Sequence, residues 1–494
     1  MSGVRRALAF AVAERYAGMA ISFLSVVAVS RLLTPTEVGI SALGLALVGI
    51  PNAFREFAAC NFLIQGHEVT RADVRTAFTV QFGLTLAICA GLVLLAPFFA
   101  DFYDQPMLDR FVCVVTAALM IDAIAAPIMS MLRRDLAFGS LAIISLAALS
   151  THTMVVVLLS ASGFSFMSFA WAWLASILAT LALCLWYRPD LSIFLPTFGR
   201  WRRAMVFGGY NGAITLLAKI YESIPQLFLG RIMPLDMLGL YNRTVIVSGI
   251  ADRFILAGVF NIAFPALAQE FRAGRSLKEP LLNAFSYITA FYWPALAMMA
   301  LLAYPIVDLI LGDQWTAVAP LLQIVAVASL ACFPMVLMQP LLMAIDAMRH
   351  AFMVSLIGMP TSALVLCAAS PFGVRAMIAS QLFTVPFQVY VGLTYIRRHV
   401  PYSWLEVAIA LRSSAILTAW SVLPVLLILA TTGFDMDISF GLAVFAGSLS
   451  ALAWLVGLRL TNHPINAELR RAMAAFRHTV AGRAVLRLLP TGAR

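Results

Sequence analysis

Apolar stretches of about 20 residues recur along the whole chain, and they limit what it can fold into more than any other feature. Each is long enough, as a helix, to cross a hydrocarbon core about 30 Å thick. With 62% hydrophobic residues, a water-soluble fold would be left with a largely apolar surface. The strict alternation of a membrane β-barrel is absent from the sequence. We therefore predict an all-α polytopic membrane protein with about 14 transmembrane helices.

The predicted spans cover most of the sequence between residues 9 and 460. They lie at about residues 9–33, 38–64, 77–100, 107–131, 138–160, 164–187, 204–230, 238–264, 282–310, 316–345, 350–370, 373–396, 405–430 and 438–460. An arginine-rich loop separates spans six and seven, and a basic segment with helical periodicity follows the last span. We expect an N-terminal six-helix lobe, a basic cytoplasmic linker, a C-terminal six-helix lobe, two additional helices and a basic amphipathic cytoplasmic tail, at residues 1–187, 188–203, 204–396, 397–460 and 461–494.

One nine-residue pattern occurs twice, 200 positions apart. Residues 31–39 (the first corner) read Arg-Leu-Leu-Thr-Pro-Thr-Glu-Val-Gly, and residues 231–239 (the second corner) read Arg-Ile-Met-Pro-Leu-Asp-Met-Leu-Gly. Each copy joins two apolar spans and contains a proline followed two residues later by an acid. A corner used twice at corresponding points indicates two copies of one helical unit, an arrangement common among transporters. We expect Arg31 and Arg231 to lock their corners against Glu37 and Asp236.

The basic residues set the orientation. If the N-terminus is cytoplasmic, the predicted inner segments hold 23 of the 33 Lys and Arg residues, and the outer loops hold Arg31, Arg110, Arg231 and Arg375. This bias follows the positive-inside rule for short loops. It places both termini in the cytoplasm. It also assigns the net charge of +10 to topology and anionic membrane lipids, so no nucleic-acid partner is expected.

Five motifs along the chain resemble one known family. They are Ser30–Gly39, Leu132–Phe138, Leu238–Arg243, Phe264–Ala268, and Leu311–Trp315 followed by Ala319–Leu322. In this order they are similar to the bacterial polysaccharide flippases of the Wzx type, in the multidrug/oligosaccharidyl-lipid/polysaccharide exporter superfamily. The branch that exports colanic-acid and succinoglycan-type exopolysaccharides is most similar. The resemblance implies two pseudo-symmetric six-helix bundles in a V around a central cavity, with two extra C-terminal helices.

Several ionisable residues fall inside the predicted spans, where a charge costs at least about 2.5–3.5 kcal/mol at mid-helix. We predict that three cations, Arg55, Lys219 and Arg253, bind an anionic lipid headgroup, because Arg and Lys suit phosphate oxygens. The acids nearby could serve ion coupling or simply pair with the cations; they are Glu56, Asp122, Glu222 and Asp252. Sugar contacts are predicted at Tyr16, Tyr210 and Asn211, for which membrane-interface anchoring is the alternative.

These observations predict a flippase of the bacterial inner membrane that moves undecaprenyl-diphosphate-linked oligosaccharide repeat units outward by alternating access. Besides membrane lipids, a polysaccharide polymerase and a chain-length regulator are expected partners. A peptidoglycan-precursor flippase or a cation-coupled drug exporter of the same superfamily is the first alternative. A membrane glycosyltransferase or polymerase is the second, although the short outer loops disfavour an enzyme. We expect no metal site and no cofactor beyond a coupling proton or sodium ion.

Overall fold

The structure is a computed structural model that describes residues 2–58, 71–195, 197, 209–256, 267–461 and 463–466. Side chains are described from residue 14 onwards, with the exception of residues 56–58, 71–73, 191–192 and 209–212. The predicted amphipathic tail, from residue 467, and most of the predicted basic linker after residue 195 lie outside the described part. Their character stays a prediction.

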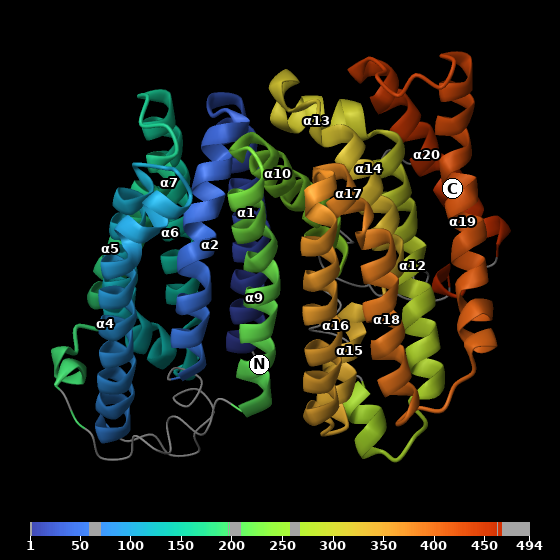
Figure 1. The fold of residues 1–494 in the computed structure, drawn as a ribbon. Coiled ribbons are helices and arrows are strands. Elements are labelled where there is room, and N and C mark those ends of the chain that lie inside the picture. Colours follow the sequence, from blue (N-terminus) through green and yellow to red (C-terminus); the bar gives the residue numbers. More distant parts are fainter. Residues whose placement is uncertain are drawn as a thin grey trace, which may run out of the picture. The chain divides into compact units, whose positions relative to one another are not determined.

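The described residues form helices and contain no strand, which confirms the predicted all-α class (Figure 1). The helices of the first half are α1 (Ser2–Leu32), α2 (Pro35–Ala58), α4 (Arg71–Phe102), α5 (Leu108–Arg134), α6 (Phe138–Ala161), α7 (Met167–Tyr187), α9 (Gly209–Ile232) and α10 (Leu235–Ala251). Those of the second half are α12 (Lys278–Leu301), α13 (Ala303–Leu311), α14 (Val318–Ser329), α15 (Met335–Ala344), α16 (Met348–Ala369), α17 (Val374–Ala379), α18 (Gln381–Arg397), α19 (Trp404–Thr431) and α20 (Phe440–Leu460). In lipid a helix is favoured because it satisfies its own backbone hydrogen bonds.

Among the described residues, twelve helical segments are long and apolar enough to cross a membrane. The chain is therefore a multi-pass membrane protein, but the predicted count of 14 is not confirmed. The two predicted spans without a match correspond to α9 and α10. Helix α9 carries Lys219 and Glu222, and α10 has 17 residues.

The chain folds as two compact units, and each is described by itself. The first unit comprises residues 1–246, 307–321 and 348–384, and the second comprises 247–306, 322–347 and 385–494. Both corners of the repeat lie in the first unit, where α2 packs beside α9 (Figure 1). The predicted lobe boundaries stay a prediction.

The two corners have the same local structure, shifted by 200 residues. Helix α1 ends at Leu32 and α2 begins at Pro35, while α9 ends at Ile232 and α10 begins at Leu235. The expected pairing of each arginine with its own corner acid is wrong. Glu37 instead accepts hydrogen bonds from the backbone N–H and the hydroxyl of Thr34, at 2.8 and 2.9 Å, and so caps α2. Asp236 accepts from the backbone N–H of Met237.

The corners pack against each other through their glycines. A Cβ atom on Gly39 would lie 1.9 Å from the carbonyl oxygen of Leu235, and one on Gly239 would lie 1.9 Å from the carbonyl oxygen of Pro35. These two contacts are equivalent under the 200-residue shift. Only glycine, which has no side chain, permits so close an approach of two backbones. The repeat in the sequence is therefore a reciprocal contact in the fold.

A third segment of the first unit, residues 309–315, docks on the end of α1. Arg31 donates to the carbonyl of Leu309 at 3.0 Å. Gln314 donates its amide to the carbonyls of Ser30 and Leu33, at 2.6 and 3.2 Å, and the indole N–H of Trp315 donates to Ser30 at 2.7 Å. The Trp315 side chain is fully buried. The unpaired carbonyls at the C-terminus of α1 thus receive side-chain donors from a segment almost 280 residues away in the chain.

In the second unit, α19 and α20 pack with α12 (Figure 1). Apolar side chains of all three helices form a common core around Val425, Leu429 and Ala446. Polar contacts fix the register, because Trp454 donates to the carbonyl of Ala290 at 2.8 Å and Thr289 donates to the hydroxyl of Ser414 at 2.8 Å. The two C-terminal helices are therefore tightly integrated with α12.

His463, just beyond α20, is buried between these helices. Its Nδ1 accepts from the backbone N–H of Ile465 at 3.2 Å, so the neutral ring carries its proton on Nε2, which faces the hydroxyls of Ser414 and Ser286 at 3.1 and 3.3 Å. Burial lowers the pKa of His463 below its usual 6.5. Protonation of Nδ1 would replace the acceptor that Ile465 requires with a second donor.

Replacing Gly39 with valine is expected to destabilise the first unit, because the opposing backbone must retreat until the 1.9 Å gap exceeds about 3 Å. A strain of about 1–3 kcal/mol or more is expected from such overpacking. The measurement is the melting temperature of the purified protein in detergent. Gly91→Val is the matched control, since a Cβ on Gly91 of α4 meets nothing within 4 Å. Equal melting temperatures for the two variants would contradict the close contact between corners.

The stability of the second unit should fall as the pH drops below about 6.5, the pKa of histidine in an unfolded chain. The unfolded chain takes up a proton there, whereas folded His463, with its lowered pKa, does so only at lower pH, so acid favours unfolding. Melting temperatures at pH 7.5 and pH 5.5 test this. His463→Gln, which does not titrate, should lose part of the pH dependence; an unchanged dependence would assign it to other groups.

Candidate functional site

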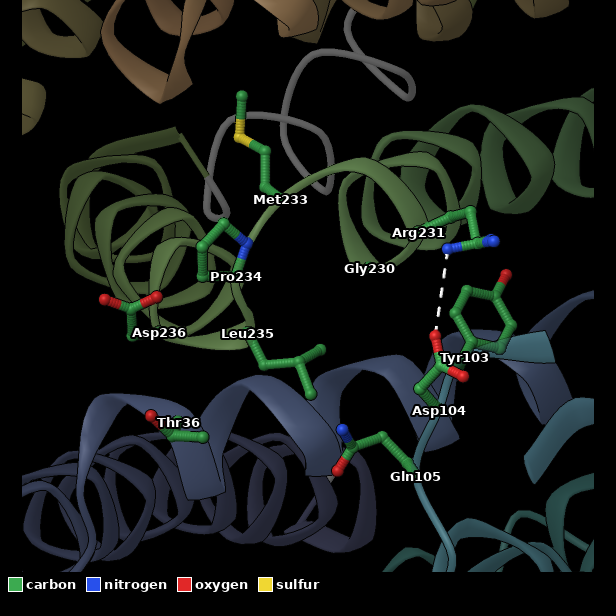
Figure 2. A pocket seen from close by; sticks show the side chains of 10 residues that line it. All are labelled: Thr36, Tyr103, Asp104, Gln105, Gly230, Arg231, Met233, Pro234, Leu235 and Asp236. Carbon is green, nitrogen blue, oxygen red and sulfur yellow. Dashed lines mark ion pairs between the residues drawn. The ribbon is translucent and has the colours of Figure 1, made fainter. Parts of the chain in front are cut away.

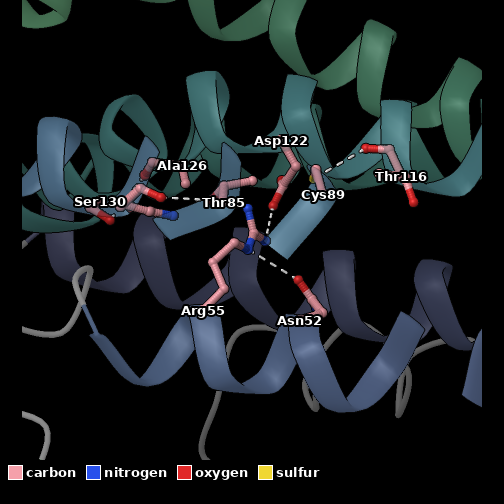
Figure 3. Close-up of polar contacts among 9 residues, drawn as sticks. Asn52, Arg55, Thr85, Cys89, Thr116, Asp122, Ala126 and Ser130 are labelled. Atoms are coloured by element: carbon pink, nitrogen blue, oxygen red, sulfur yellow. Dashed lines mark hydrogen bonds and ion pairs between the residues drawn. The ribbon is translucent and has the colours of Figure 1, made fainter. Parts of the chain in front are cut away.

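Arg55 is the most deeply buried of the predicted binding residues whose side chains are described. It lies in the last described turn of α2, and 3% of its side chain is exposed. One terminal guanidinium nitrogen pairs with Asp122 of α5, and Nε donates to Asn52 at 3.1 Å (Figure 3). Thr85 and Cys89 of α4 lie beside the pair in the same view. Helices α2, α4 and α5 thus enclose one charge and its counter-ion.

The pairing of Arg55 is incomplete. Its other terminal nitrogen, Nη1, is buried and has no hydrogen-bond partner among the residues that the structure describes. Asp122, on the opposite side of the ion pair, keeps 29% of its side chain exposed. A buried donor without an acceptor is costly, whereas a carboxylate has several acceptor positions. The arrangement therefore neutralises Arg55 in this state and leaves one donor that a further acceptor could satisfy.

Lys219 reaches α2 from α9. Its ammonium pairs with Glu222, one helical turn away, at 3.0 Å, with 37% and 60% of the two side chains exposed. Gly49 of α2 makes room for it, since a Cβ there would lie 2.9 Å from Cε of Lys219. The exposure of both groups distinguishes this pair from the enclosed pair of Arg55 and Asp122.

Arg55 extends from one side of α2, and Lys219 of α9 contacts α2 on a different side. Gly49, which Lys219 contacts, and Arg55 are six residues apart, about 9 Å along a helix axis and about 120° around it. The structure therefore gathers the two predicted cations around one helix, but it does not place them side by side on one surface of that helix.

Asp252 and Arg253 belong to the second unit and are described within it alone. They occupy a short π-helical turn, Asp252–Leu256, at the end of α10. Asp252 accepts a hydrogen bond at 2.6 Å from the hydroxyl of Tyr292. Tyr292 belongs to α12, and its side chain is fully buried. Arg253 is exposed. Such turns within helices are frequent at functional sites.

The other predicted contacts are less informative. Tyr16 lies on α1 with 63% of its side chain exposed. The side chains of Glu56, Tyr210 and Asn211 lie outside the described residues. Their roles, like those of the cations, stay predictions. Among the described residues, no three His, Cys, Asp or Glu side chains are grouped so that they could hold a metal ion.

Three contributors to these contacts were missed by reasoning from the sequence. Asn52 precedes Arg55 by one helical turn, so helical spacing could have indicated it. Gly49 and Tyr292 carry no such signal. Gly49 matters because a side chain from another helix crosses it, and Tyr292 because it meets an acid 40 positions away.

The sequence is similar to bacterial proteins whose names refer to lipopolysaccharide and succinoglycan biosynthesis. Lipopolysaccharide biosynthesis protein WzxC of Escherichia coli (strain K12) is 20% identical over 315 residues, 63% of this chain and 63% of that protein. Succinoglycan biosynthesis transport protein ExoT of Rhizobium meliloti (strain 1021) is 22% identical over 331 residues, 66% of each chain. The matched stretch thus spans less than two thirds of either relative.

Solved structures with the same fold include a flippase and a multidrug transporter. The lipid II flippase MurJ in an inward closed conformation has a TM-score of 0.71 and 10% identity, covering 92% of this chain and 98% of that one. An inward-facing multidrug resistance MATE family transporter of the MOP superfamily has a TM-score of 0.55 and 13% identity, covering 78% and 93%. The predicted family resemblance is confirmed. Residues 28–320, more than half of the chain, match the family described as polysaccharide biosynthesis protein, and the chain belongs to that family.

Proposed function

We propose that the protein is a flippase that carries undecaprenyl-diphosphate-linked oligosaccharide repeat units from the inner to the outer leaflet of a bacterial inner membrane, with both termini in the cytoplasm. Family membership and the names of the relatives support the class of cargo. The shared fold supports the class of machine. The observation that carries the proposal is the buried guanidinium of Arg55, one nitrogen of which has no partner within the described part of the chain.

The physical task is to move a large, hydroxyl-rich, anionic head through hydrocarbon while the prenyl tail stays in lipid. A transporter solves this by enclosing the head between helices and opening to one side at a time. Outward movement of a negative head is favoured by an inside-negative potential, by about 2.3 kcal/mol per charge for every 100 mV. The chain therefore needs cations that bind the diphosphate and then release it.

Arg55 and Asp122 suit binding followed by release. A phosphate oxygen can occupy the free Nη1 and compete with Asp122 for the paired nitrogen, because a guanidinium binds phosphate through two parallel hydrogen bonds. When the cargo leaves, Asp122 can restore the pair, so the cation does not remain bare in a low-dielectric site. Lys219 and Glu222 would repeat this exchange on the other side of α2 in a more hydrated setting.

Coupling to a proton or sodium ion, through Asp122, Glu222, Asp252 or Glu56, is a further part of the proposal. So are contacts with a polysaccharide polymerase and a chain-length regulator, which the supply and use of such repeat units would require. A glycosyltransferase or polymerase activity is not proposed, because a relative is named a transport protein and a structure with the same fold is named a flippase.

Arg55→Ala should abolish transport of a fluorescent undecaprenyl-diphosphate oligosaccharide in proteoliposomes, because it removes the phosphate donors and leaves Asp122 unpaired. Arg55→Lys should retain part of the rate, since an ammonium keeps the charge but loses the second donor. The matched control is Arg375→Ala, at an exposed arginine on α17. Transport by Arg55→Ala at the wild-type rate, with normal incorporation, would remove this residue from the site.

A charge swap distinguishes a pairing role for Lys219 from cargo binding. In the double variant Lys219→Glu with Glu222→Lys the pair is preserved but the positive charge moves by one helical turn. If Lys219 holds phosphate, transport should fall by about tenfold or more, the loss expected for a misplaced charged hydrogen bond. If the pair only stabilises α9, the swap should transport normally and only the single variants should be impaired.

A further inference from the structure

A polar pocket of about 350 Å³ lies at the crossing of the two corners (Figure 2). It is bounded by Gly230, by Arg231 and residues 233–236 of the second corner, by Thr36 of α2 and by the loop between α4 and α5. That loop supplies three side chains, Tyr103, Asp104 and Gln105. The volume falls in the range of small-ligand sites. On the predicted topology, the pocket is on the outer face of the membrane.

The equivalent groove at the first corner is already filled. There Gln314 and Trp315 insert against the end of α1 and donate to the carbonyls of Ser30 and Leu33. The side chain that fills most of the space is a flat, apolar ring with one N–H donor, and its neighbour supplies an amide. This occupied groove shows which chemistry the end of such a helix accepts.

The 200-residue shift maps that groove onto the pocket. Ser30 corresponds to Gly230 and Leu33 to Met233, and both Gly230 and Met233 line the pocket. The carbonyl of Gly230 lacks its helical donor, because the residue four positions on is Pro234, which has no N–H. Ser30 and Leu33 accept side-chain hydrogen bonds at the first corner, whereas their counterparts at the second corner line a pocket.

The loops that reach the two corners are also related. Asp313-Gln314 is followed by Trp315, whereas Asp104-Gln105 is followed by Pro106. Each loop lies at the arginine of its corner, since Cγ of Arg31 is 3.7 Å from where a Cβ of Gly312 would be and Arg231 is 3.9 Å from Asp104. The pocket is thus the counterpart of the first groove with proline in place of the tryptophan that would occupy it.

We infer that this pocket binds one neutral hexopyranose unit of the glycan head. A pyranose ring offers what Trp315 and Gln314 offer elsewhere: a flat face with apolar C–H groups and several hydroxyl donors. The inference rests on the proposed function, which would deliver such a ring to this side of the membrane.

The charges around the pocket select against an anion. Arg231 carries one positive charge, while Asp104 and Asp236 carry two negative ones. The single ion pair among the pocket residues is loose, at 3.9 Å, with 54% and 82% of its side chains exposed, so both groups can turn to hydroxyls. Tyr103 is held in place by its hydroxyl, which donates to the carbonyl of Leu227 at 3.3 Å, and it presents its ring beside Arg231 (Figure 2).

Pro106→Trp is the direct test, because it recreates the Asp-Gln-Trp sequence that fills the first groove. The full chain in nanodiscs is examined by saturation-transfer NMR with methyl α-glucopyranoside, N-acetylglucosamine and glucuronate, at millimolar concentrations suited to about millimolar affinity. Wild type should show signals from the two neutral sugars and weaker ones from glucuronate. In Pro106→Trp the sugar signals should be about tenfold weaker than in wild type, and in Gln105→Ala they should also be weaker.

Phe372→Trp, at an exposed position of the first unit, is the matched control and should bind as wild type does. Absence of sugar signals from wild type, full retention in both pocket variants, or a preference for glucuronate would each overturn the inference. Transport of the fluorescent lipid-linked oligosaccharide is measured in parallel. If the wild-type protein transports but binds no sugar, only the inference about this pocket is wrong. If the wild-type protein does not transport, the proposed function is wrong, and the NMR result alone decides whether the pocket binds sugar.

Discussion

The first unit depends on one backbone contact, the reciprocal approach of Gly39 to Leu235 and of Gly239 to Pro35. Hydrocarbon provides no hydrophobic drive for helices to associate, so close packing at small residues matters more than in water. At this crossing the ends of four helices, α1, α2, α9 and α10, meet, and each brings backbone groups that its own helix cannot satisfy. The segment around Trp315 supplies donors to such groups at the end of α1, and a pocket lies beside Gly230 at the end of α9.

Charge placement follows a second constraint, the cost of an ion in a low-dielectric interior. This cost is reduced in a different way at each of the three cations. Arg55 is enclosed with Asp122, Lys219 is paired but hydrated, and Arg253 is exposed beside an acid that a buried tyrosine holds. A cargo that must be bound and released is suited to pairs that can exchange partners, and the incomplete pairing of Arg55 provides such a pair.

Much of this could be predicted from the linear pattern. The apolar spans predicted the all-helical membrane fold, and five short motifs predicted the family. The spacing of the two corners predicted a repeated unit, and the structure gives it a geometric counterpart. The sequence also identified Asp122 as an acid available to pair within the membrane. It did not identify Asp122 as the partner of Arg55, because the two are 67 positions apart and local spacing carries no information about such a contact. For the same reason the corner arginines were assigned to nearby acids, whereas they engage Leu309 and Asp104.

The sequence by itself determined the class of the protein. The length of each apolar segment and the distribution of basic residues govern membrane insertion, and both are properties of the linear sequence. Tertiary structure alone decided which carbonyl lies against which glycine, which acid neutralises which base, and that Trp315 packs at the first corner while a pocket lies beside the second. Those outcomes depend on helices distant in the chain meeting within about 4 Å, the range in which packing and hydrogen bonding act. Two corners that share one sequence pattern therefore have different surroundings, and the difference lies in the segments that fold against them.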